Sequence, residues 1–170
     1  MKHLGLDPGL RHTGWGVVES DGNRLRHIAN GSVSPDPSLP MAVRLALLHD
    51  AIAEIIAVHE PDCAAVEETF VSRNAGSALK LGQARGVVLL APARAGLPVA
   101  EYSANAIKKA VVGVGHADKR QIDMMVRTLL PGCAPASPDA ADALAVAICH
   151  AHHAATARRL SVAVAAGAAP

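Results

Sequence analysis

The first three apolar stretches of the chain have the pattern of β-strands. Lys2–Leu6 is a short apolar stretch typical of a central strand, and Gly14–Glu19 and Arg24–Val33 are two further strand candidates. Between the last two lies Asp21-Gly22-Asn23, whose composition is that of a hairpin turn. The pattern therefore predicts three strands, of which the second and third form a hairpin.

Helical periodicity begins after this hairpin. Apolar residues recur every three or four positions in residues 39–60, and Pro61-Asp62 ends that predicted helix. Two more strands are predicted at residues 63–68 and Pro98–Tyr102, and the other predicted helices are Ser77–Ala91, Ala104–Val111, Lys119–Leu130 and Pro138–Arg159. This order predicts an α/β fold with a mixed five-stranded sheet flanked by helices on both faces. We expect one domain over residues 1–159 and a flexible Ala-rich tail over residues 160–170.

Composition and charge add two constraints. The 170 residues are 51% hydrophobic but include one Trp, one Tyr and one Phe, so the core must be aliphatic. The formal net charge is +1, yet the segment 73–127 contains nine Lys or Arg and three acids, which gives it +6 and leaves −5 for the rest. This asymmetry favours an anionic partner for the middle of the chain, although solvated basic helix faces would give the same count.

The cysteine pattern and the N-terminus indicate a cytoplasmic protein. Cys63, Cys133 and Cys149 are odd in number and lack metal-ligand spacing, so we expect reduced, packed thiols. Asp7 interrupts the first apolar stretch, which excludes a signal peptide, and no apolar run reaches the ~18 residues of a membrane span. The cluster of His150, His152 and His153 is interpreted as solvated or partly packed rather than as metal ligands.

Acidic residues follow two of the predicted strands. Asp7 ends the first strand, and Glu67 and Glu68 end the strand at residues 63–68. The carboxyl ends of neighbouring parallel strands line the crevice where ligands bind in open α/β sheets. Successive strand residues point to opposite faces, so only one of the two glutamates can share a site with Asp7.

The last predicted helix adds two more carboxylates. Asp139 and Asp142 are three positions apart, which places both on one face of its first turn after the N-cap candidate Ser137. Acids in a first turn also stabilise the helix dipole and need no other purpose. Several carboxylates in one pocket repel each other unless a cation lies between them, and oxygen ligands favour Mg²⁺ or Mn²⁺. A pair of such ions is the usual device for phosphodiester hydrolysis.

Five sequence blocks carry a resemblance to a known family. "GLDPG…TGWGVV", "VEETF", "SALKLGQARGVV", "VVGVGHADKRQIDMMV" and "DAADALAVAICH" resemble, in order and spacing, the signature blocks of the RuvC family of Holliday-junction resolvases. The resemblance covers residues 2–153 and implies an RNase H-like fold and a homodimer with two active sites. It also implies Mg²⁺- or Mn²⁺-dependent nicking, with two ions per site, of opposed strands in four-way junction DNA. A branch-migration motor complex, RuvA and RuvB, is the implied protein partner.

The resemblance also assigns residues. It selects Glu67 over Glu68, so that the implied catalytic and metal-binding set is Asp7, Glu67, Asp139 and Asp142. Phe70, which composition alone would place in the core, is implied to stack on unpaired bases. Lys108 and Lys119 match lysines that contact DNA or steady the scissile phosphate. Less specific candidates for phosphate contacts are Arg73, Lys80, Arg85, Lys109 and Arg120.

Alternatives remain at this stage. The apolar face of residues 77–91 fits a buried structural face or, by the resemblance, a dimer interface. An Asp-x-Gly turn after a strand also occurs in actin-like and sugar-kinase-like ATPases, but the chain is short for two such domains and shows no second phosphate motif. A third alternative is a non-catalytic junction-binding module with vestigial acids, which would bind a junction in Mg²⁺ without cutting it.

Overall fold

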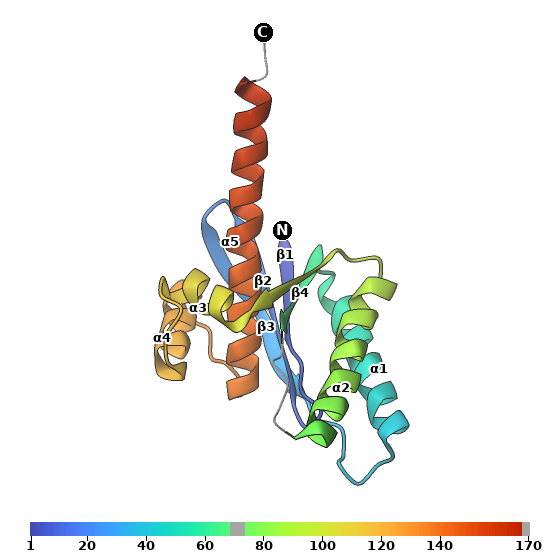
Figure 1. The fold of residues 1–170 in the computed structure, drawn as a ribbon. Helices are drawn as coiled ribbons and strands as arrows, with labels where there is room; N and C mark the ends of the chain where they lie inside the picture. The colour runs from blue at the N-terminus through green and yellow to red at the C-terminus, as the bar shows by residue number, and fades with distance from the viewer. Residues whose placement is uncertain (69–73, 168–170) are drawn as a thin grey trace.

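A mixed five-stranded sheet forms the centre of the molecule, as predicted. The computed structural model describes residues 1–68 and 74–167, and its strands are β1 (Lys2–Asp7), β2 (Thr13–Asp21), β3 (Arg24–Val33), β4 (Cys63–Glu68) and β5 (Val99–Ser103) (Figure 1). Their order in the sheet is β3-β2-β1-β4-β5. β1, β2 and β3 pair antiparallel as a meander, whereas β1–β4 and β4–β5 are parallel. The parallel pairs bring the carboxyl ends of β1, β4 and β5 to one edge.

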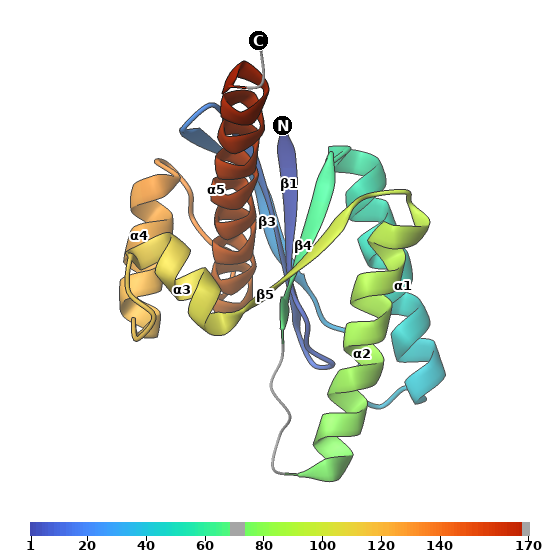
Figure 2. The same ribbon diagram turned by 45° about the horizontal axis from the view of Figure 1, so that its top comes forward.

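Helices cover both faces of the sheet, which also confirms the prediction. α1 (Met41–His59) and α2 (Ala75–Arg94) lie on one side, and α3 (Ala104–Val112), α4 (Lys119–Leu129) and α5 (Pro138–Gly167) lie on the other (Figure 2). Two aliphatic clusters result. One packs α3, α4 and α5 against the sheet around Val126, Leu144 and Ile148, and the other packs α1 and α2 around Leu48, Ile52 and Val88. Within the described residues, no helix combines the length and apolar character needed to cross a membrane.

Several helix boundaries differ from those predicted, and two of the differences have a clear local cause. α2 begins at Ala75 rather than Ser77, because the Asn74 side chain accepts a hydrogen bond from the Ser77 amide and caps the first turn. α5 continues to Gly167 instead of ending near Arg159, so the predicted flexible tail is helical up to that glycine (Figure 1). The physical reason is composition, because an Ala-rich stretch has high helix propensity and contains no breaker before the glycine.

Candidate active site

The paired ends of β1 and β4 place two of the predicted acids side by side. Leu6 of β1 is in register with Val66 of β4, so the next residues along each strand are Asp7 and Glu67. Both side chains are partly buried, whereas Glu68 is exposed. The cavity at this edge of the sheet is lined by Asp7 and Glu67, and Glu68 is not among the residues that line it. Of the two glutamates, Glu67 is therefore the one that shares this cavity with Asp7.

The first turn of α5 brings the other two acids to the same edge. The Ser137 side chain accepts a hydrogen bond from the Ala140 amide at 3.1 Å and so fixes the start of this turn. Close contact with the sheet depends on glycine. A Cβ atom at Gly14 of β2 would lie 2.0 Å from the carbonyl oxygen of Asp139, and one at Gly5 of β1 would lie 2.1 Å from that of Ala143. The absence of side chains at these two positions lets α5 lie directly on β1 and β2.

A cavity of about 330 Å³ is lined by three of the acids and by two lysines. Asp7, Glu67 and Asp142 line it together with Lys108 from α3 and Lys119 from the start of α4. Ile107 and Ile122 form part of the wall. The Lys119 ammonium donates a hydrogen bond to Asp142 Oδ2 at 3.1 Å, and its side chain is 82% exposed. Asp118 and Gln121 form a capping box that fixes the first turn of α4, where Lys119 lies.

Burial and neighbouring charges raise the pKa of two of the acids, Asp7 and Glu67. Burial, followed by the charges of Glu67, Asp142 and Asp139, raises the pKa of Asp7 from its ordinary value of 3.8 to about 7. Burial and then the charge of Asp142 raise the pKa of Glu67 above its usual range. The hydrogen bond to Asp142 and its charge raise the pKa of Lys119. Asp139 is therefore coupled to the site through its charge, although it does not line the cavity.

This arrangement fits a hard divalent cation. The acidic donors are carboxylate oxygens. Burial and then the neighbouring negative charges oppose ionisation of Asp7, and a bound cation would offset both. Within the described residues, no three of these acids bring an oxygen each within 4.8 Å of one another. The carboxylates are therefore spread around the cavity rather than gathered in one tight cage.

The remaining predicted residues divide into three groups. Lys108 and Lys119 line the acidic cavity, and Arg120 lines the cleft beside it. Lys80 is exposed on α2, Lys109 lies near His152 and His153 on another side of α3, and Arg85 is ion-paired with Glu101. Those three are therefore outside the cavity. Phe70 and Arg73 lie outside the described residues.

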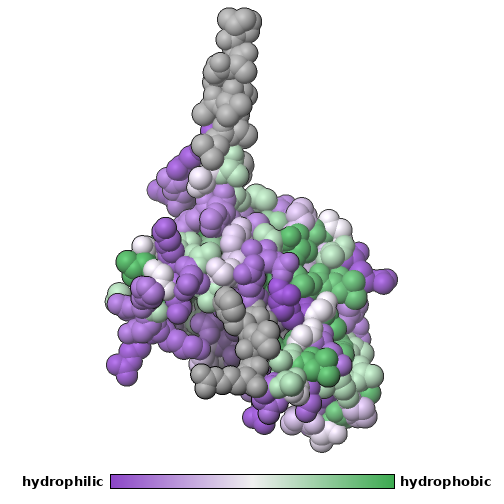
Figure 3. All heavy atoms as spheres, in the orientation of Figure 1, coloured by the Kyte–Doolittle hydropathy of each residue, from purple (hydrophilic) through white to green (hydrophobic). Residues whose placement is uncertain are grey.

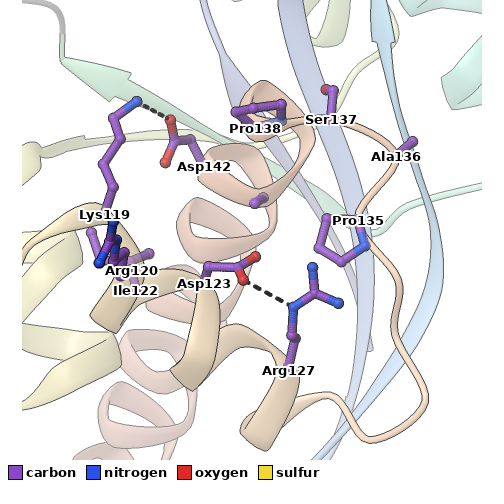
Figure 4. A pocket seen from close by; sticks show the side chains of 11 residues that line it. Lys119, Arg120, Ile122, Asp123, Arg127, Pro135, Ala136, Ser137, Pro138 and Asp142 are labelled. Atoms are coloured by element: carbon purple, nitrogen blue, oxygen red, sulfur yellow. Dashed lines mark hydrogen bonds and ion pairs between the residues drawn. The ribbon is translucent and has the colours of Figure 1, made fainter.

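A second cleft, of about 600 Å³, adjoins the acidic cavity and contains a residue that the sequence analysis did not select. Arg120 and Arg127 of α4 line it together with Ser137 and the first residue of α5, Pro138 (Figure 4). Lys119 and Asp142 line both this cleft and the acidic cavity. Arg127 donates a hydrogen bond to Asp123 at 2.9 Å. The signal that could have found Arg127 is its spacing of seven residues from Arg120, which places both on one helix face.

The sheet and the acidic edge define the chain as an α/β protein of the RNase H-like type. A family model described as "Crossover junction endodeoxyribonuclease RuvC" matches residues 3–150. The chain belongs to the RuvC family of crossover junction endodeoxyribonucleases, and it is accordingly a nuclease. This membership confirms the resemblance seen in the sequence and removes the ATPase alternative.

Individual relatives agree with this assignment. The chain is 62% identical over 165 residues to the RuvC of Paramagnetospirillum magneticum. The aligned region covers 97% of this chain and 99% of that protein. It is 60% identical over 167 residues to the RuvC of Rhodospirillum rubrum, covering 98% and 99% of the two chains. Among solved structures, Thermus thermophilus RuvC in complex with a Holliday junction substrate has a TM-score of 0.86 at 38% identity, covering 92% of this chain and 96% of that one.

Proposed function

We propose that the protein is a structure-selective endonuclease that resolves four-way DNA junctions by paired, symmetric nicks. The observation that carries this proposal is that Asp7, Glu67 and Asp142 line one cavity, with Asp139 near enough for its charge to raise the pKa of Asp7, in a member of this nuclease family. The Thermus thermophilus relative that shares the fold is described in complex with a Holliday junction substrate. By family membership, the RuvA–RuvB branch-migration complex is the proposed protein partner.

Two Mg²⁺ ions, replaceable by Mn²⁺, are proposed to bind the carboxylates. We assign one ion to Asp7 and Asp142 and the other to Glu67 and Asp139. When bound, such ions supply Lewis acidity and a water deprotonated near neutral pH. The residues of the chain orient the cluster, because β1 and β4 fix two carboxylates and the capped first turn of α5 fixes the others. Lys108 and Lys119 add positive charge at the mouth, where a phosphate oxygen would lie.

The proposal is tested with a synthetic mobile four-way junction and a linear duplex of the same sequence. We expect paired nicks in the junction in Mg²⁺, none in EDTA and little cleavage of the duplex. Glu67→Gln should lower the cleavage rate by at least about 1,000-fold because it removes a metal-binding carboxylate. Glu68→Gln is the matched control and should cut like the wild type, since Glu68 is exposed and does not line the cavity.

Two outcomes would contradict the proposal. Tight junction binding without nicks in Mg²⁺ or Mn²⁺ would leave a non-catalytic binding module. Equal cleavage of junction and duplex would leave a nuclease without structural selectivity.

Lys119 is predicted to assist catalysis more than stability. Lys119→Met should slow junction cleavage by about 100-fold, because an electrostatic stabiliser at the mouth of the site is lost. Its 82% exposed side chain makes the ion pair with Asp142 a weak contributor to folding, so the melting temperature should change little. Single-turnover cleavage rates measure the first effect. Lys109→Met, on another side of α3, is the control, and an equal loss of rate in both variants would contradict the assignment.

A homodimer is proposed to supply the two active sites that paired nicks require. α2 buries Ala84, Val88 and Ala91 against the rest of the molecule. Its opposite side exposes Leu79 and Leu90, which are 67% and 51% exposed and, being eleven residues apart, lie on one helix face. Hydrophobic patches are visible over α1 and α2 in Figure 3. Both sequence interpretations of this helix therefore find support, on opposite faces.

Leu90→Glu is predicted to break this dimer. A charge at an apolar contact between two copies costs desolvation energy, so the variant should sediment as a monomer at concentrations where the wild type is dimeric. Val114→Glu, which changes an exposed valine outside α1 and α2, should remain dimeric. Sedimentation velocity measures both variants, and a dimeric Leu90→Glu would place the interface elsewhere.

A further inference from the structure

A second group of metal-ligating side chains lies away from the acidic cavity. His3, Cys63 and His150 come from β1, β4 and α5, and one ligand atom from each lies within 4.8 Å of the other two. His3 and Cys63 are fully or almost fully buried, and His150 is partly buried. None of the three lines the acidic cavity.

The register of the sheet shows why these residues meet. His3 and Cys63 are direct partners in the parallel β1–β4 pair, and each is four residues before an acid of the active site, Asp7 or Glu67. Residues two or four apart along a strand share a face, and Gly5, between His3 and Asp7, contacts α5. The cluster therefore lies on the same face of the sheet as the active site, under the same helix.

Strand and helix spacings agree on how far apart the two sites are. Four residues of a strand span about 13 Å. On α5, His150 follows Asp142 by eight residues, a rise of about 12 Å. The same three elements thus carry the carboxylates at one end and the His-Cys-His cluster at the other.

Hydrogen bonds around the cluster orient both imidazoles. His3 Nδ1 lies 3.3 Å from Cys63 Sγ, and its Nε2 lies 2.8 Å from the hydroxyl of Ser20. His150 Nδ1 lies 2.9 Å from the hydroxyl of Tyr102. Metal-ligating histidines commonly use one ring nitrogen for the metal and the other for such an outer partner.

We propose that His3, Cys63 and His150 bind a Zn²⁺ ion that fastens β1, β4 and α5 together at the end opposite the active site. A thiolate with two imidazoles is a donor set for Zn²⁺ and not for Mg²⁺, so the two sites would take different metals. When Zn²⁺ binds, the Cys63 thiol loses its proton to solvent and becomes a thiolate ligand. A water molecule would supply the fourth ligand of a tetrahedral site. The proposed site would use Cys63 and His150, which lie far apart in the sequence and share no local ligand spacing.

The test is metal binding by the full-length chain after removal of bound metal with a chelator. Co²⁺ is the probe, because a thiolate ligand gives it a charge-transfer band, and Zn²⁺ is then added to displace it. We expect one equivalent per chain, a band lost in Cys63→Ser and kept in Cys133→Ser, and no competition from excess Mg²⁺. Zn²⁺ should also raise the melting temperature of the wild type and of Asp7→Asn.

His150→Gln provides a second variant if Cys63→Ser fails to fold, because His150 is only partly buried. It should weaken Zn²⁺ binding at least tenfold. The proposal is overturned if the wild type shows no thiolate band, or if Cys63→Ser and His150→Gln bind Zn²⁺ as Cys133→Ser does. Both results would leave the junction-cleavage proposal untouched, since that proposal depends on the carboxylates alone.

Discussion

Asp7→Asn is expected to lower junction cleavage by at least about 1,000-fold, because the carboxylate at the centre of the acidic cluster is lost. Asn has nearly the same shape, so the variant should fold and still bind the junction. Cleavage of a labelled junction in Mg²⁺, beside a binding titration, separates the two effects. Cleavage at the wild-type rate by folded Asp7→Asn would refute the metal-site proposal.

The same substitution should stabilise the metal-free protein at neutral and higher pH. The pKa of Asp7 is about 7 in the folded chain and near 3.8 when unfolded. At a pH between these two pKa values, Asp7 is ionised in the unfolded chain but keeps its proton in the folded chain. The free energy of unfolding therefore falls as the pH rises through this range. The penalty is complete above pH 7, at no more than about 4 kcal/mol. The Asp7→Asn variant has an uncharged amide at this position and escapes the penalty.

Urea unfolding in EDTA from pH 4 to pH 8 measures this difference. The two free energies of unfolding should diverge as pH rises through this range, with Asp7→Asn the more stable at pH 8. Glu68→Gln, at an exposed neighbour of the site, should follow the wild-type curve. Addition of Mg²⁺ should stabilise the wild type and not Asp7→Asn, because binding to the folded state adds to its stability. Parallel curves for wild type and Asp7→Asn would show that neither burial nor the neighbouring charges penalise the ionised Asp7.

The sequence predicted the acidic edge because simple rules of strand geometry governed it. Asp7 is the last residue of β1 and Glu67 the last but one of β4, and parallel pairing of those strands was sufficient to bring them together. Asp139 and Asp142 needed only a helix start, which Ser137 and Pro138 mark. Strand alternation alone could not choose between Glu67 and Glu68, since it does not say which face α5 will cover.

Contacts between side chains distant in sequence were beyond such rules. Arg85 was a candidate for phosphate contact, but it pairs with Glu101 of β5, which only the folding of α2 back along the sheet brings near. His3, Cys63 and His150 are separated by 60 and 87 residues and share no motif. His3 and Cys63 are neighbours because β1 and β4 pair in one particular register, and a shift of one residue would separate them. Local sequence patterns do not predict that register.

Gly14→Ala is expected to lower both the thermal stability and the rate of junction cleavage, because it adds a Cβ atom where there is no room for one. A Cβ at this position would lie 2.0 Å from the carbonyl oxygen and 2.4 Å from the carbonyl carbon of Asp139, where real contacts stay beyond 3.0 Å. Those atoms belong to the backbone of α5, so no side-chain rotation relieves the clash. Overpacking of this kind costs about 3 kcal/mol or more, which lowers the melting temperature by roughly 6–12 °C.

The catalytic effect of Gly14→Ala follows from where α5 must move. Its first turn carries Asp139 and Asp142, so relief of the clash shifts both carboxylates away from Asp7 on β1. A displacement near 1 Å at a reacting centre costs about 100-fold in rate. Gly115→Ala is the matched control, because its Cβ would meet nothing within 4 Å, and it should melt and cut like the wild type. Differential scanning calorimetry and junction cleavage measure the two effects. If Gly14→Ala also melted and cut like the wild type, the carboxylates would not depend on the contact between β2 and α5, and the site would tolerate a looser helix than this packing implies.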